Sequence, residues 1–137
     1  MKTVESLIAK EKDGSLSFGN FTLPQKSKVS DFAHEGDLYK VKTFNEITKL
    51  EKNGLFVYES VPGTSVFNFR SDGDVTAFNV TGSSDVQITL ELEPDKTYEV
   101  SVNSVKLEPV KTNLGGKLVF SVEAKEDEFT AVEVKRV

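Results

Sequence analysis

The chain has 137 residues, the length of one ordinary domain, and it carries a net charge of −5 and no cysteine. The lack of cysteine excludes a disulfide framework and thiolate sites for zinc or iron–sulfur clusters, and the acidic balance argues against nucleic acid as a partner. No apolar run approaches the roughly 20 residues of a membrane span, and the N-terminal run is too short for a signal peptide. We therefore expect a cytoplasmic protein that contacts no membrane.

Turn-forming residues divide the N-terminal part of the chain. Asp13-Gly14 predicts a hairpin that pairs residues 4–10 with residues 16–21, because glycine tolerates the positive φ of tight turns. Residues 24–37 are the least regular part, and we expect a loop or a short helical turn around Val29–Ala33. Asn53-Gly54 suits a type I′ turn and predicts a hairpin between residues 46–52 and 55–60.

The C-terminal part alternates apolar and polar residues with a period of two. Residues 86–92, 98–102 and 118–122 each place their apolar side chains on one face of an extended segment. This pattern indicates antiparallel sheets with one face on a core and one face in water. By the same alternation we expect Phe67, Phe69 and Phe78 to point inward.

The fold class predicted from these segments is all-β. We expect an antiparallel β-sandwich of eight to eleven strands, Ig-like or jelly-roll-like, because regular turns separate short apolar runs. Residues 1–137 form a single domain in this interpretation. Within it, the N-terminal hairpins (residues 1–54) are added to a main sandwich (residues 55–137).

Residues that could carry chemistry are few. His34 is the only histidine and lies close to Asp37; a single histidine beside a turn is typical of a solvated loop. Asp72-Gly73-Asp74 lacks the further ligands of a calcium loop, so it predicts a turn. Gly115-Gly116-Lys117 lacks the spacing of a phosphate-binding loop and also predicts a hairpin turn. We therefore predict no catalytic, metal-binding or cofactor-binding residue.

Candidate ligand-binding residues come from the polar segment around His34 and from the tyrosines. The chain has no tryptophan, so Tyr39 and Tyr58 are the aromatic side chains best suited to stack on a sugar ring, since Tyr98 is expected to face inward. Together with His34 and Asp37, they form the set of candidate ligand-binding residues.

Four segments carry a family resemblance: DGSLSFGN at 13–20, GDLYKVKTF at 36–44, YESVPGT at 58–64 and TNLGGKL at 112–118. Together they resemble a family of small clostridial proteins often labelled "endosialidase catalytic beta chain". The resemblance spans nearly the whole chain and implies a small β protein, with a label that suggests hydrolysis of sialic-acid polymers. Sialidase-type sites bind the sialic-acid carboxylate with clustered arginines, whereas this chain has only Arg70 and Arg136. We therefore transfer no catalytic residue.

Residues 90–122 are also similar to accessory β-sandwich modules that end many polysaccharide-degrading enzymes. Those modules usually pack against a catalytic partner or another copy. Three functions remain open: a non-catalytic interaction module that self-associates or docks onto a larger protein, a carbohydrate-binding accessory module, or a small glycan-hydrolase subunit. The first predicts a homo-oligomer or a larger protein partner, and the second predicts a glycan ligand.

Overall fold

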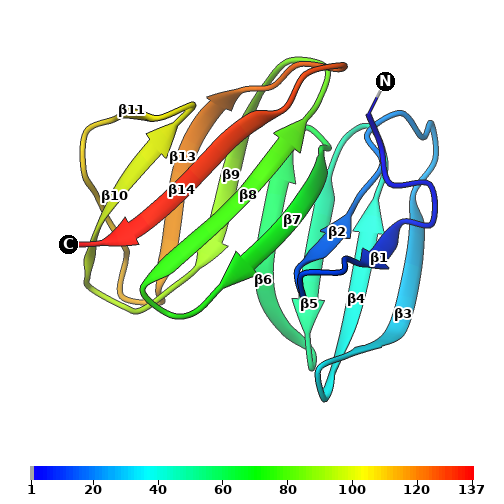
Figure 1. Ribbon diagram of the computed structural model, residues 1–137, viewed down its shortest axis with the longest axis horizontal. Coiled ribbons are helices and arrows are strands. Elements are labelled where there is room, and N and C mark those ends of the chain that lie inside the picture. The colour runs from blue at the N-terminus through cyan, green and yellow to red at the C-terminus, as the bar shows by residue number, and fades with distance from the viewer. Residues whose placement is uncertain (1) are drawn as a thin grey trace.

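The computed structural model describes residues 2–137, which form fourteen β-strands paired only in antiparallel fashion (Figure 1). In chain order they are β1 (Ile8–Lys10), β2 (Leu16–Phe18), β3 (Ser27–His34), β4 (Asp37–Thr43), β5 (Thr48–Lys52), β6 (Leu55–Val61), β7 (Ser65–Ser71), β8 (Val75–Thr81), β9 (Asp85–Glu91), β10 (Thr97–Val102), β11 (Val105–Lys106), β12 (Val110–Lys111), β13 (Lys117–Glu123) and β14 (Thr130–Arg136). The predicted all-β fold is confirmed. The expected number of strands is too low because four strands have only two or three residues. Within residues 2–137, no helix has the length and apolar character needed to cross a membrane.

Two sheets face each other across one core. Sheet A has eight strands in the order β1-β2-β7-β8-β14-β10-β11, with β12 also paired to β10, and sheet B has six in the order β13-β9-β6-β5-β4-β3. The N-terminal strands widen both sheets: β1 and β2 extend sheet A beyond β7, and β3 to β5 extend sheet B beyond β6 (Figure 1). Side chains from both parts of the chain form one hydrophobic cluster.

The predicted hairpin at Asn53-Gly54 is confirmed. Asn53 and Gly54 have φ values of +51° and +80°, as the two central positions of a type I′ turn require, and they join β5 to β6. The hairpin at Asp13-Gly14 also forms and begins at Lys10 and Leu16 as predicted, but its paired part is shorter because it already ends at Ile8 and Phe18.

Residues 24–37 contain a strand, so the predicted loop or helical turn is wrong. β3 runs along the outer edge of sheet B and pairs with β4 through the turn at Glu35-Gly36. The pairing shifts between Val29 and Phe32, where Asp31 has a φ of +57°. This bulge changes the phase of the alternation within the strand and explains why a simple period of two is hard to recognise there.

The alternation predicted for the C-terminal segments is confirmed. Ile88, Val100 and Leu118 are completely buried, and Tyr98 also lies inside, at 1% exposure. Tyr58 of sheet B contacts aromatic rings of sheet A, with its ring centroid 5.3 Å from Phe18 and 5.7 Å from Phe78. These edge-to-face contacts join the two sheets at the centre of the core.

One predicted core residue, Phe67, points away from the core. The pairing of β7 with β8 shifts by one residue between Phe67 and Arg70, and Asn68 within this bulge has a φ of +56°. The extra residue separates Val66 from Phe69 on the inner face and turns Phe67 outward, where its ring lies 4.9 Å from that of Phe129. Phe69 and Phe78 face inward as predicted.

A chain of buried hydroxyl groups connects the N-terminal strands to the main sandwich. Asn20 donates its N–H to Thr43 Oγ1 at 2.9 Å, and Thr43 Oγ1 lies 2.8 Å from Thr48 Oγ1. Thr48 Oγ1 then donates to the carbonyl of Thr64 at 2.7 Å and accepts the N–H of Thr64 at 3.0 Å. The hydroxyl of Thr64 lies 2.9 Å from that of Tyr58. Because these groups are buried, each depends on the others for its hydrogen bonds.

Candidate functional site

Three of the four candidate ligand-binding residues line one cavity of about 370 Å³ where β2 and β7 approach β4, β5 and β6. These are His34, Asp37 and Tyr39, and the ring centroids of His34 and Tyr39 lie 6.0 Å apart. His34 lies in a strand and is only 8% exposed, so the expectation of a solvated loop histidine is wrong. Its Nε2 donates to the carbonyl of Gly14 at 2.9 Å, a contact between two hairpins.

The charged groups of this cavity have partners within the protein. Asp37 Oδ1 accepts a hydrogen bond from Asn53 at 2.9 Å, and this bond, helped by Lys52 at 3.4 Å, lowers the pKa of the Asp37 carboxyl. Arg70 forms an ion pair with Asp13. Such engagement is typical of groups that hold two hairpins together. We therefore interpret the polar residues that line the His34 cavity as structural contacts between the hairpins.

The two tyrosines of the candidate set have different environments. Tyr39 is half-buried at the cavity, and partial desolvation raises the pKa of its hydroxyl. Tyr58 is completely buried beneath sheet B, where burial raises the pKa of its hydroxyl above the usual value. Tyr58 therefore offers no surface for stacking on a ligand, and its place in the candidate set is wrong.

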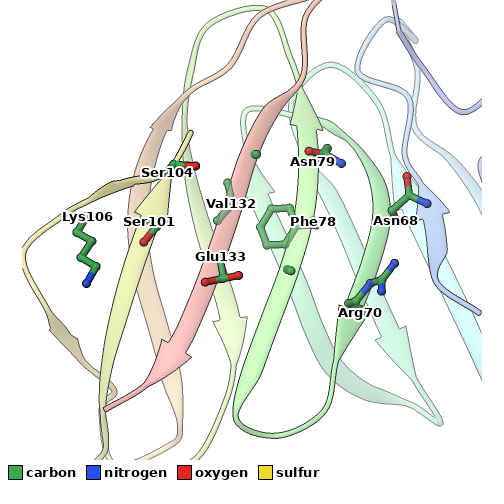
Figure 2. A pocket seen from close by; sticks show the side chains of 11 residues that line it. Asn68, Arg70, Phe78, Asn79, Ser101, Ser104, Lys106, Val132 and Glu133 are labelled. Atoms are coloured by element: carbon green, nitrogen blue, oxygen red, sulfur yellow. The ribbon is translucent and has the colours of Figure 1, made fainter. Parts of the chain in front are cut away.

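A larger hollow of about 520 Å³ lies on the outer face of sheet A, and Figure 2 shows the side chains around it. It crosses β7, β8, β14, β10 and β11. A single cross-strand row follows it from one side to the other, in the order Arg70, Ala77, Glu133, Ser101, Lys106. Figure 2 places Arg70 and Lys106 at opposite sides with Glu133 between them.

The hollow exists because its floor is made of small side chains. Ala77 lies on β8 and Ala131 on β14, and neither fills the space above the sheet. Asn68, Asn79 and Ser104 add neutral donors and acceptors around them. The bulge in β7 brings Asn68 to this face, where its side-chain amide also donates to Ser15 at 3.2 Å.

This face of sheet A was not predicted from the sequence, although the residues carry a signal for it. The water-facing positions of most strands carry long charged side chains, whereas Ala77, Asn79, Ser101 and Ala131 are short. Four short side chains on neighbouring strands predict a depression, but only the strand order brings them together.

The two edges of sheet B differ in how well they are protected. β3 is interrupted by its bulge and carries Lys28 and Asp31, features that discourage pairing with another strand. β13 pairs with β9 over seven residues without a register shift. The exposed side chains at its middle, Val119 and Ser121, are uncharged.

The hydrogen-bond pattern shows which residues of β13 face its free edge. At one end, Leu92 donates its N–H to the carbonyl of Gly116, and at the other Ala124 donates its N–H to the carbonyl of Ser84. Hydrogen-bonded pairs alternate with non-bonded pairs along an antiparallel ladder. The even-numbered residues of β13 therefore bond to β9, and the odd-numbered residues direct their backbone groups outward.

Two of these outward-facing residues lie at the centre of the edge. The side chain and N–H of Asn113 engage the backbone of Lys117, and the hydroxyl of Thr130 donates to the carbonyl of Glu123. Val119 and Ser121 lie between these ends, and β13 pairs only with β9 among the described strands. Their N–H and C=O groups thus form a short row available to a further strand.

Within residues 2–137, no group of three or more histidine and carboxylate side chains is placed to hold a metal ion. The predicted turn at Asp72 is confirmed, since its Oδ1 accepts the N–H groups of Asp74 at 3.1 Å and Val75 at 2.9 Å. The predicted turn at Asn113–Gly116 also forms, but it leads from sheet A to sheet B and does not join two strands of one hairpin. Comparison with known proteins returns no family model, no curated protein and no solved structure that matches the chain.

Proposed function

We propose that this protein is a non-catalytic interaction module that pairs with a second copy of itself through the free edge of β13. The observation that carries the proposal is the row of outward-facing backbone groups at Val119 and Ser121, in the uncharged middle of a regular edge strand. Antiparallel addition of a strand would satisfy these groups and extend sheet B.

The residues of β13 favour a second copy as the added strand. In a two-fold antiparallel pairing centred on Phe120, Val119 lies opposite Ser121 of the other copy, and Lys117 lies opposite Glu123. Opposite charges therefore meet at both ends, and uncharged residues meet in the middle. This register also places Val119 and Ser121 in hydrogen-bonded positions, because both direct their backbone groups to the free edge.

Light scattering coupled to size-exclusion chromatography tests this pairing. We expect a species of twice the 15.1 kDa chain mass that dissociates on dilution. Ser121→Pro should yield the monomer, because it removes an outward N–H and leaves the bonds to β9 intact. Val119→Lys should act similarly by placing a charge at the edge. A wild-type protein that stays monomeric at all concentrations contradicts the proposal.

Val61→Lys is the matched control. Val61 is 50% exposed and Val119 is 42% exposed, both on the outer face of sheet B, but Val61 lies on the interior strand β6. If the dimer forms by stacking of sheet faces, Val61→Lys disrupts it as well, and the edge proposal fails. The chain has no cysteine, so an equimolar mixture of Val119→Cys and Ser121→Cys proteins should also cross-link faster than either protein alone.

A second candidate function, carbohydrate binding, is favoured by the hollow on sheet A. Its amide, hydroxyl and charged groups surround a floor of small residues, an arrangement suited to a polar chain laid across the strands (Figure 2). Phe67 lies opposite Asn79 at one side of the hollow and provides an aromatic surface there.

Calorimetric titration with a panel of neutral oligosaccharides tests this candidate. Ala77→Gln and Ala131→Gln fill the floor and should abolish the heat of binding, whereas Ala33→Gln, at an exposed alanine of β3, should leave it unchanged. Absence of heat with every oligosaccharide, or full binding by the two filled variants, rejects the hollow as a glycan site.

A further inference from the structure

Three lysines lie directly opposite one another on the outer face of sheet B. Lys28 of β3 pairs in register with Lys42 of β4, and Lys42 pairs with Lys49 of β5. We call these three residues the lysine ladder. Adjacent strands are about 4.8 Å apart, so the ladder places three ammonium groups along a line perpendicular to the strands.

The ladder differs from other lysines of the described chain in its lack of ion pairs. Five other lysines form ion pairs with carboxylates: Lys52, Lys106, Lys111, Lys117 and Lys125. Among the described residues, no ladder lysine forms an ion pair, and only Lys49 has an aromatic contact, 5.9 Å above the ring of Phe56. Like charges directly opposite each other destabilise a sheet, so this arrangement has a cost in the free protein.

The surroundings of the ladder widen the positive surface. Lys26 lies over the ring of Phe44 on one side, and Lys40 lies next to Lys42 in alternation on the other. Glu51 and Glu59 lie opposite Lys40 and Lys49, but neither forms an ion pair with a described residue. The region therefore has an excess of positive charge in a protein whose net charge is −5.

A shallow hollow adjoins the positive surface. It has a volume of about 330 Å³ and is lined by Ser30, Lys40, Glu51 and Asn53, among others. The bulge at Asp31 shapes its wall. Hydroxyl, amide and carboxylate groups in such a hollow can accept and donate hydrogen bonds to the hydroxyls of a sugar ring.

We propose that the lysine ladder binds a linear acidic polysaccharide that crosses β3, β4 and β5 with its anionic groups on the lysines and its sugar hydroxyls in the adjoining hollow. A polysaccharide with a single line of charges, one for each repeating unit, matches one row of lysines. A nucleic acid fits less well, because its higher charge density would meet the acidic remainder of the protein. The two aromatic rings beside the ladder, Phe44 and Phe56, each have a lysine over the ring face that a base would need for stacking. This site is distinct from both the β13 edge and the sheet A hollow.

Binding to polygalacturonate and hyaluronate oligosaccharides, measured by calorimetry at about 0.05 M salt, tests the proposal. Lys42→Gln should weaken binding about fivefold, and the triple glutamine variant of the ladder should lose it. Raising the salt to about 0.5 M should remove binding to the wild type, whereas uncharged dextran should not bind under either condition. Lys96→Gln, at an exposed lysine outside the region that forms no ion pair with a described residue, is the matched control.

Thermal unfolding distinguishes a binding residue from a structural one, because the two predict changes of opposite sign in the melting temperature. Without ligand, Lys42→Gln should raise the melting temperature by on the order of 2 °C at low salt, because it relieves the repulsion of the Lys42 ammonium group by those of Lys28 and Lys49. A lysine that merely supports the fold would lower the melting temperature when replaced. A gain in stability together with a loss of affinity therefore identifies a binding residue.

Three results overturn the proposal. The first is the absence of binding to both acidic polysaccharides at low salt. The second is an equal loss of affinity with Lys96→Gln, which would show that the whole protein charge acts without a defined site. The third is tighter binding to single-stranded DNA than to either polysaccharide, which would assign the surface to nucleic acid. Because the dimer and the sheet A hollow are tested with other variants, none of these results depends on them.

Discussion

The N-terminal strands β1–β5 and the C-terminal strands β6–β14 share one core but present different surfaces. Residues 1–50 have a net charge of +1 and carry the lysine ladder, whereas residues 51–137 have a net charge of −6 and carry the sheet A hollow and the free edge of β13. Within sheet B, Leu50 of β5 pairs with Tyr58 of β6. Within sheet A, Phe18 of β2 pairs with Val66 of β7. Strands added to a sandwich can therefore share its hydrophobic core while their outer surface keeps a different charge.

The largest expected effect is at the corner where β6 passes into β7. A Cβ atom on Gly63 would lie 2.0 Å from the carbonyl oxygen of Phe44, in the turn between β4 and β5. Gly63→Ala must therefore push the N-terminal strands away from the main sandwich. We expect a loss of roughly 3 kcal/mol in the free energy of unfolding, measured by denaturant titration.

Gly115→Ala is the control for that substitution. Gly115 does not need a positive φ, and its added Cβ would meet only the side-chain oxygen of Asn113, at 3.3 Å. We expect a change of less than about 1 kcal/mol. If Gly63→Ala instead unfolds in two separate transitions, then residues 2–54 and 55–137 are independent units, and the comparison of two surfaces on one core fails.

The C-terminal strands were easier to predict from sequence than the N-terminal ones, for a physical reason. Residues 86–92 and 118–122 lie in long, regular strands with one face in the core, so the period of two is visible in the residues themselves. β3 and β7 contain bulges, and one extra residue reverses the phase of every side chain after it. The prediction therefore failed for Val29–Ala33 and for Phe67.

The candidate sites depend on information that the linear sequence does not contain. His34 is buried because a hairpin twenty residues earlier places the carbonyl of Gly14 against its ring. The ladder requires the register of three strands, since Lys28, Lys42 and Lys49 are far apart in the sequence and only the pairing brings them together. The free edge of β13 requires the order of the whole sheet. The alternation of residues in the sequence shows which side chains share a face of a strand. Which residues become neighbours on the next strand depends on strand order and register, which the sequence does not show directly.

A smaller effect is expected within the chain of buried hydroxyls, where the side chain of Thr48 joins the two parts of the molecule. The hydroxyl of Thr48 donates to the carbonyl of Thr64 and accepts the N–H of the same residue, so one side chain bonds the N-terminal strands to the main sandwich. Thr48→Val keeps the shape but removes the partner of the Thr64 N–H and carbonyl and the acceptor for the O–H of Thr43, which keeps only the hydrogen bond from Asn20. We expect a loss of about 2 kcal/mol, with an unchanged denaturant dependence.

Thr97→Val is the matched control for that substitution, because Thr97 is exposed on β10 and its effect should stay within about 0.5 kcal/mol. Amide hydrogen exchange then distinguishes two modes of unfolding. If the hydroxyl chain stabilises the molecule as one cooperative unit, Thr48→Val lowers protection in β9 and β13 as much as in β4 and β5. Loss of protection confined to β4 and β5 would mean that the N-terminal strands open by themselves. The positive surface would then belong to a separable unit, and the lysine ladder could order or disorder without affecting the free edge of β13.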